Sequence, residues 1–169
     1  MKRSIVMAAA LAVLLLVQAT GADSADPATV LKAETMAAVI GPYVGSTGTP
    51  IRGVHGGGLP WQIDDAKVVL LADGRLTVKV EGLVLLDAAP VPEALRGTNP
   101  IASFEAIVSC ESIDASGAAV TRNEPTGPFP ATTAGDSRID ATVDLPSPCF
   151  APVVFVASPT GAWFAVTGV

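Results

Sequence analysis

Apolar and polar residues alternate one by one over residues 76–81, and this pattern constrains the fold more than any other feature of the sequence. The segment reads LTVKVE, with the apolar residues two apart. Successive side chains of a β-strand point to opposite faces, so this strand has one buried face and one wet face. A β-rich run at 66–71 precedes it, with Asp73-Gly74 between the two. Asp-Gly between strands favours a type I′ turn, whose central residues need positive φ, so we predict a hairpin over 62–86.

The same alternation recurs in the second half of the chain, at residues 103–111 and 138–144. Ile107 is the one apolar residue on the polar side of the first of these strands, and we expect it to be exposed. Residues 153–156 are all apolar, which predicts a central strand covered on both faces. Turn residues separate these segments, and only residues 92–95 favour a short turn of helix.

Together these segments predict about eight short strands and no long helix. The expected fold class is all-β, an antiparallel β-sandwich of immunoglobulin-like architecture with loops rich in Gly and Pro. No tryptophan lies between the two cysteines, so we do not predict membership of the immunoglobulin family itself. Residues 26–40 are ambiguous, because Asp26-Pro27 could begin a helix. The β character of the remainder favours a first strand or an N-terminal arm over residues 23–45, before a single sandwich domain over 46–169.

Residues 1–22 have the three parts of a secretory signal peptide. Lys2 and Arg3 precede thirteen apolar residues, 5–17, and small residues follow as far as Ala22. Thirteen helical residues span only about 20 Å, less than the roughly 30 Å of hydrocarbon in a bilayer. We therefore expect cleavage between Ala19 and Ala22, and a secreted, extracellular protein without a stable membrane anchor.

The expected mature chain of 169 − 22 = 147 residues is acidic. Two of the ten basic residues leave with the signal, so 10 − 2 = 8 remain against 16 acidic residues, a net charge of −8. This balance argues against nucleic acid and anionic membrane surfaces as partners.

Cys110 and Cys149 are the only cysteines, and both follow the signal. In an oxidising compartment two cysteines most simply form one disulfide. Cys110 ends an alternating strand and Cys149 precedes the most apolar one. The bridge is therefore expected to join two core strands, and a link across the two sheets is one arrangement that would do so.

The string His55-Gly56-Gly57-Gly58 matches the oxyanion-hole loop of lipases and esterases. Those enzymes also need a GxSxG nucleophile and a separate catalytic histidine, but the sequence has no such motif and no other histidine. One histidine and two paired cysteines also leave too few ligands for zinc or copper. Asp140 and Asp144 are outward positions of an alternating strand, and only folding could create a glycosidase-like carboxylate pair. We expect no catalytic residue, no metal and no cofactor.

Trp61 and Trp163 each stand near the start of a strand, where packing into the end of a sandwich is the commoner outcome. If both rings were exposed and coplanar, they could instead form a stacking platform for sugars. His55 lies close to Trp61 in the sequence, in the glycine loop. These three residues are therefore the candidates for ligand binding.

Five strings carry a resemblance: PIRGVHGGGLPW at 50–61, GTNP at 97–100, VSC at 108–110, PFPAT at 128–132 and SPC at 147–149. Together they resemble a group of small exported bacterial proteins of unknown function. The resemblance implies that the glycine loop and the two cysteines are shared features of that group, and it implies no activity.

We therefore expect a non-enzymatic secreted protein with a role in extracellular recognition or structure. Its partner would be an extracellular protein or a polysaccharide. The first alternative is a binding module for carbohydrate or a cell-envelope polymer at Trp61 and the glycine loop, and the second is an enzyme with a carboxylate pair. An exposed apolar patch or an unprotected edge strand would favour a protein partner.

Overall fold

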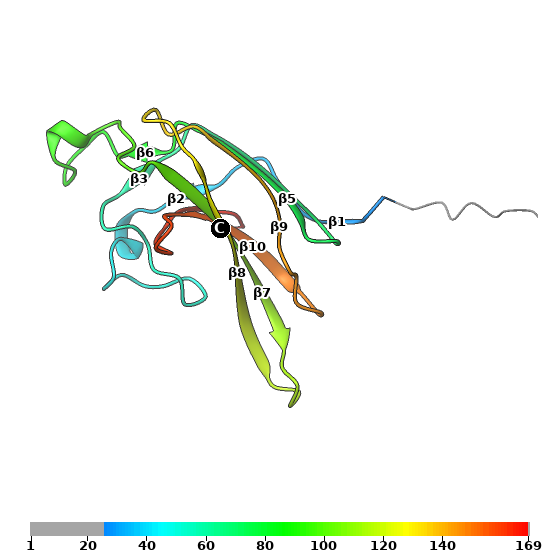
Figure 1. Ribbon diagram of the computed structural model, residues 1–169. Helices are drawn as coiled ribbons and strands as arrows, with labels where there is room; N and C mark the ends of the chain where they lie inside the picture. Colours follow the sequence, from blue (N-terminus) through cyan, green and yellow to red (C-terminus); the bar gives the residue numbers. More distant parts are fainter. Residues whose placement is uncertain (1–25, 169) are drawn as a thin grey trace, which may run out of the picture.

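The computed structural model describes residues 26–168, and the predicted signal peptide at 1–22 lies outside them. These residues form eleven strands and two short 3-10 helices. Two antiparallel sheets enclose one hydrophobic core, and a small two-stranded ladder lies beside them (Figure 1). The predicted all-β, sandwich-like fold is confirmed.

The first sheet has the order β1-β4-β5-β9. Its strands are β1 (Thr29–Ala33), β4 (Asp65–Leu71), β5 (Arg75–Glu81) and β9 (Ser137–Thr142). In β5 the apolar residues of the alternating pattern are all buried, and the residues between them are exposed or half-buried. The period of two in the sequence therefore marks the inner and outer faces of this sheet.

The hairpin predicted over residues 62–86 is confirmed, since β4 pairs with β5 and the pairing resumes beyond a short interruption. There, β3 (Trp61–Gln62) pairs with β6 (Val84–Leu85). The predicted type I′ turn is wrong, because only Gly74 has a positive φ, of 84°. The Gly74 amide donates to the Leu71 carbonyl at 3.0 Å, and the Asp73 carboxylate accepts from the Arg75 amide at 3.1 Å. This side-chain hydrogen bond suits an Asp of negative φ, with the glycine alone in the left-handed region.

The second sheet has the order β2-β11-β10-β7-β8. The strands are β2 (Ala37–Ala38), β11 (Trp163–Val166), β10 (Phe150–Ala157), β7 (Ser103–Ile113) and β8 (Ala119–Pro130). Strand β10 is central, and residues 154–157 at its end are all buried. Residues 153–156 thus lie in a central strand, as predicted, although Val153 itself is only half-buried.

The outer face of β7 is covered as well, so the expectation that Ile107 is exposed is wrong. Ile107 is only 6% exposed and Ser109 is fully buried. Arg52, from the loop over residues 41–58, reaches this sheet, and its guanidinium donates to the Ser109 carbonyl at 2.9 Å and to the Ala151 carbonyl at 2.7 Å. The loop is therefore hydrogen-bonded to β7 and β10, beside residues that the local alternation predicts to be exposed.

Residues 26–40 form strands rather than a helix. Strand β1 pairs with β4 in the first sheet, while β2 pairs with β11 in the second. The segment is therefore part of the sandwich and not an arm outside it. Strand β2 leads into the 3-10 helix η1 (Gly41–Tyr43). The helical turn predicted at residues 92–95 corresponds to η2 (Glu93–Leu95). Within residues 26–168, no helix has the length and apolar character needed to cross a membrane.

The disulfide between Cys110 and Cys149 is present. Cys110 lies on β7, and Cys149 immediately precedes β10, the neighbouring strand of the same sheet. The two Cα atoms are 5.0 Å apart, a spacing typical of adjacent strands, whereas packed sheets lie about 10 Å apart. The bridge therefore staples one sheet and does not cross between the two.

Candidate functional site

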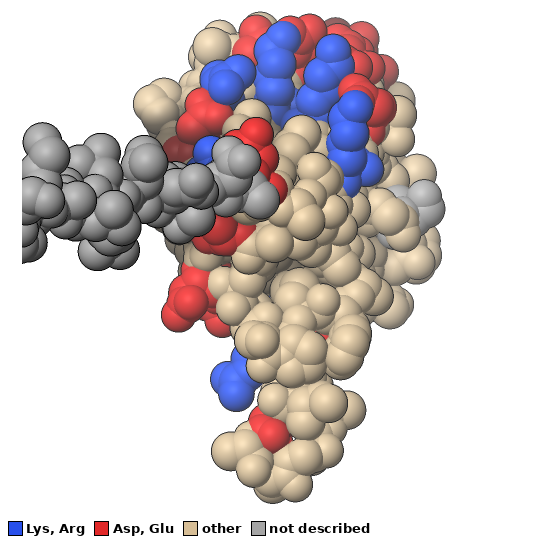
Figure 2. All heavy atoms as spheres, turned by 90° about the vertical axis from the view of Figure 1, so that its right-hand side faces the viewer, with Lys and Arg blue, Asp and Glu red and all other residues tan. Residues whose placement is uncertain are grey.

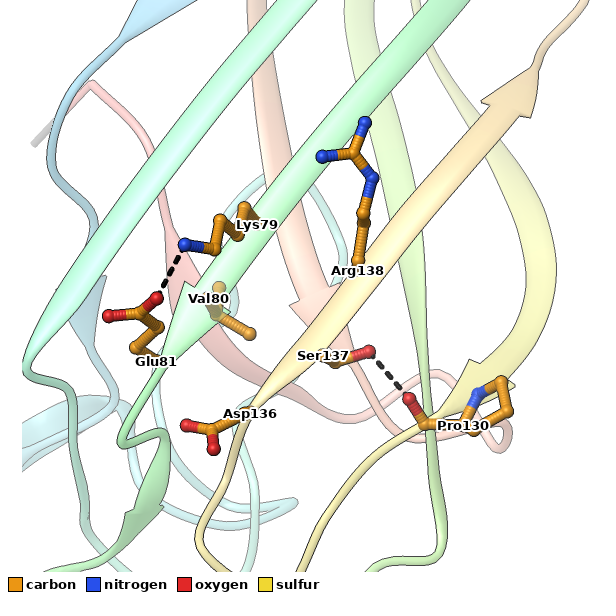
Figure 3. Close-up of a pocket in the computed structure, with 7 residues that line it drawn as sticks. All are labelled: Lys79, Val80, Glu81, Pro130, Asp136, Ser137 and Arg138. Carbon is orange, nitrogen blue, oxygen red and sulfur yellow. Dashed lines mark hydrogen bonds and ion pairs between the residues drawn. The ribbon is translucent and has the colours of Figure 1, made fainter.

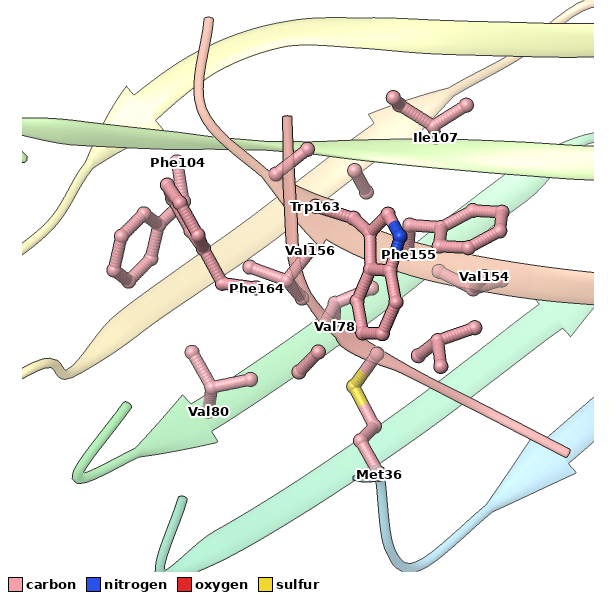
Figure 4. Close-up of a cluster of buried hydrophobic side chains, with 14 of the residues drawn as sticks. Met36, Val78, Val80, Phe104, Ile107, Val154, Phe155, Val156, Trp163 and Phe164 are labelled. Carbon is pink, nitrogen blue, oxygen red and sulfur yellow. The ribbon is translucent and has the colours of Figure 1, made fainter. Parts of the chain in front are cut away.

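The two tryptophans singled out in the sequence are both buried, Trp61 at 3% and Trp163 at 2% exposure. Trp61 stacks on Phe164, with ring centroids 4.0 Å apart. Trp163 packs instead against Phe155 and Tyr43, with centroids 6.0 and 6.1 Å away. Figure 4 shows Trp163 and Phe155 together, with Phe104 and Phe164 beside them in the core. Both rings are thus packed, which was the commoner expected outcome, and the alternative of a stacking platform for sugars is not formed, because neither indole presents a face to solvent.

His55 and Gly58 are exposed, whereas Gly56 and Gly57 between them are buried. The His55 carbonyl accepts from the Trp163 amide at 2.9 Å, and the Gly57 amide donates to the Trp163 carbonyl at 2.8 Å. A Cβ at Gly56 would lie 2.2 Å from the Tyr43 carbonyl oxygen. These glycines therefore allow the loop to lie directly on β11, and the Gly57 amide already has an acceptor. The structure thus gives the glycine string a packing role, which needs no oxyanion hole.

Most carboxylates of the described residues are exposed, and five of them form ion pairs. Asp140 accepts from Arg138 and from the Thr77 hydroxyl, and these bonds, those from Arg138 foremost, lower its pKa. Glu105 is the exception, because it is 8% exposed and burial raises its pKa. Within residues 26–168, no group of three or more His, Cys, Asp or Glu side chains is placed to hold a metal ion.

An apolar groove of about 230 Å³ lies beside β2, at one edge of the second sheet. It is formed by β2, the segment through η1, the turn at Ile51 and strand β11. Its lining residues are Ala37, Ala38, Ile40, Tyr43, Ile51, Trp163 and Val166. Of the candidate ligand-binding residues, only Trp163 lines this groove.

The wall of the groove follows from how the chain leaves β2. Val39 is fully buried and held by two backbone hydrogen bonds, from its amide to the Phe164 carbonyl at 2.8 Å and from the Trp61 amide to its carbonyl at 2.9 Å. Gly41 then takes a φ of +57°, and the chain enters η1. Ile40 is left 55% exposed and Tyr43 37% exposed. The groove thus has two large apolar side chains in contact with water.

The edge of the sheet at this groove is open. Strand β2 pairs only with β11, through Ala37 and Ala38, and stands last in the strand order of the described residues. The opposite edge is β8, which carries Pro125, Pro128 and Pro130. Proline has no amide hydrogen to donate, so these residues protect β8 from further strand pairing. Strand β2 has no such protection.

A second depression is shallow and charged. It measures about 450 Å³ and lies between β5 and β9 (Figure 3). Lys79 and Arg138 reach it from these two strands, with Glu81 and Asp136 also in its lining. Lys79 forms an ion pair with Glu81, and the Ser137 hydroxyl donates to the Pro130 carbonyl at 2.9 Å.

No family model, no curated protein and no solved structure matches the chain. Sequence reasoning did not find the groove, because its lining residues come from distant segments of the chain. The one local signal is Ile40 followed by Gly41-Pro42, an apolar residue directly before a turn that cannot continue a strand.

Proposed function

We propose that this protein is a non-enzymatic extracellular recognition module that binds an extended apolar segment of a partner protein at the groove beside β2. The observation that carries the proposal is the exposure of Ile40 and Tyr43 around an apolar hollow. Burying a large apolar side chain contributes about 1.5–3 kcal/mol relative to leaving it in water. A partner that covers these two residues gains part of that free energy.

The open edge of β2 indicates how such a segment would lie. A peptide that adds a strand to a sheet edge gains main-chain hydrogen bonds, and adjacent pockets select its side chains. The groove lies directly beside the edge residues Ala37 and Ala38. Its volume of about 230 Å³ suits individual side chains, since pockets for drug-sized ligands measure about 300–1,000 Å³.

An extracellular location is supported by the disulfide, which persists in oxidising compartments, and by the signal peptide expected from the sequence. Prolines on β8 also support a specific role for the other edge, because the chain protects one side of the sheet against pairing and leaves β2 open.

The test is selection of peptides from a displayed random library on the immobilised protein, followed by calorimetry with the selected peptides. Ile40→Asp places a charge at the groove wall and should weaken binding at least about tenfold, which corresponds to 1.4 kcal/mol. Ile113→Asp is the matched control, because Ile113 is 48% exposed on the β7–β8 hairpin and does not line the groove. Peptides that bind both variants equally, or a library that yields no binder, would refute the proposal.

A further inference from the structure

Three cationic side chains stand in one row across the outer face of the first sheet. Lys67 on β4 pairs with Lys79 on β5, which in turn pairs with Arg138 on β9. All three are exposed. Adjacent strands lie about 4.8 Å apart, so the row presents three positive charges over about 10 Å.

The face that carries this row holds most of the positive charge of the described chain. Residues 26–168 contain 10 − 2 = 8 lysines and arginines, since Lys2 and Arg3 lie outside them. Five of these lie on the outer face of the first sheet by strand register: Lys32, Lys67, Arg75, Lys79 and Arg138. Figure 2 shows Lys and Arg side chains gathered side by side on one part of the surface, bordered by Asp and Glu. Four of the five form ion pairs with neighbouring carboxylates, so the face as a whole carries little net charge, and the row is where three of its cations are direct cross-strand neighbours.

The row is unfavourable for the protein alone, because like charges directly opposite each other on adjacent strands destabilise a sheet. Lys79 and Arg138 are each offset by a carboxylate two residues along the same strand, Glu81 and Asp140. Among the described residues, Lys67 has no such ion pair. Exposed pairs of this kind contribute only about 0–1 kcal/mol, so the three cations remain available to another anion.

Carboxylates border the row along both of its sides. On one side, Asp65 of β4 is opposite Glu81 of β5 in the strand register. On the other side, Asp140 of β9 is opposite Thr77 of β5. The backbone of each carboxylate residue lies two residues along its strand from a cation, about 7 Å away, but the side chains of Glu81 and Asp140 reach back to form ion pairs with Lys79 and Arg138. A flat anionic bilayer would press its headgroups against these carboxylates as well as against the cations. A linear polyanion that crosses the strands along the row would lie over the three cations, with these carboxylates at its sides.

The bordering carboxylates also favour one kind of linear polyanion. They accept hydrogen bonds, which the hydroxyl groups of a sugar can donate and a bare phosphate chain cannot. The depression of about 450 Å³ beside Lys79 and Arg138 gives room for sugar rings at one end of the row. We propose that Lys67, Lys79 and Arg138 bind a linear acidic polysaccharide of the polyuronate type, with one carboxylate on each sugar.

The proposal is tested by calorimetry with oligogalacturonates at low salt, using the full mature chain. The triple variant Lys67→Gln, Lys79→Gln, Arg138→Gln should bind at least about tenfold more weakly, since three exposed charge contacts are removed. The matched control is the triple variant Lys32→Gln, Arg75→Gln, Arg122→Gln. It loses an equal number of positive charges, all outside the row, and should change the affinity less than about threefold. Binding by the original chain should weaken as salt is raised, because surface charges are screened.

Three further measurements separate the alternatives. Lys67→Gln alone should weaken binding without loss of thermal stability, because Lys67 has no ion pair in the described chain. Neutral dextran should not bind, and polyphosphate and phosphatidylglycerol vesicles should bind more weakly than the oligogalacturonate. Ile40→Asp should leave oligogalacturonate binding unchanged, because Ile40 lines the groove and not the row. Failure of one proposal would therefore not imply failure of the other. Equal loss in the two triple variants, tighter binding to vesicles or polyphosphate, or no binding to oligogalacturonate would overturn it.

Discussion

Replacement of Gly56 by alanine adds one methyl group, and the structure places that group inside other atoms. The new Cβ would lie 2.2 Å from the Tyr43 carbonyl oxygen and 2.5 Å from a methyl carbon of Val39. A backbone carbonyl cannot rotate away as a side chain can. The chain at Tyr43 and the glycine loop must therefore separate.

The loss of stability depends on which contacts that separation disrupts. Forcing an extra methyl group into a packed site costs about 1–3 kcal/mol. The hydrogen bonds that join His55 and Gly57 to Trp163 are strained as well, and each contributes about 1 kcal/mol. We expect Gly56→Ala to lower the free energy of unfolding by about 2–4 kcal/mol, a large part of the 5–15 kcal/mol typical of a domain.

Gly58→Ala is the matched control, two residues along the same loop. A Cβ at Gly58 meets no atom within 4 Å, and its φ is not in the left-handed region. We expect this variant to be neutral or up to about 1 kcal/mol more stable, because alanine restricts the unfolded chain.

Both variants are measured by urea unfolding followed by tryptophan fluorescence, since Trp61 and Trp163 are buried in the folded protein. Equal unfolding free energies for the two variants would show that Gly56 is not needed for the close contact with Tyr43. Because Tyr43 forms part of the groove wall, Gly56→Ala should also weaken peptide binding, whereas Gly58→Ala should not.

Three further predictions concern other parts of the fold. Arg52→Ala removes two hydrogen bonds from a charged group to the second sheet and should destabilise the protein by about 2–3 kcal/mol in urea unfolding; a loss below 0.5 kcal/mol would contradict the anchoring role. Replacing Cys110 and Cys149 together by alanine opens a loop of 39 residues and should cost about 4 kcal/mol by chain entropy, measured by the same unfolding assay. Glu105→Gln should raise the melting temperature at pH 7, because burial holds the pKa of Glu105 above its ordinary 4.5 and penalises the ionised form. The folded-state pKa is the higher one, so Glu105 costs stability as pH rises through it. The advantage of the variant should disappear near pH 3, and an advantage independent of pH would contradict this cause.

Much of the fold was predictable, because strand periodicity and turn residues are local. The alternation over 76–81 and Asp73-Gly74 were enough to place the first hairpin, and the apolar run at 153–156 was enough to place a central strand. The same local reasoning failed at Ile107, which is buried although the alternation predicts it to be exposed. It also left open whether the disulfide stays within one sheet, because the order of strands in a sheet is not a local property.

The candidate site was less predictable than the fold. Trp61 and Trp163 were chosen for their chemistry, yet both are packed into the core. Ile40 and Tyr43 become significant only because β2 is the last strand of its sheet, and that position depends on pairing with β11 at the other end of the chain.

The sequence by itself determined which residues face inward on the alternating segments at 76–81, 103–111 and 138–144, where the chain turns and which two cysteines pair. The first two properties depend on neighbours along the chain, and the third follows because the sequence has only two cysteines. Only the tertiary structure decided which strands lie side by side. Strand pairing brings Lys67, Lys79 and Arg138 into one row, and it sets Trp163 beside the residues that follow β2. Register between distant strands is chosen by the burial of whole faces in the folded chain, so no local pattern reveals it.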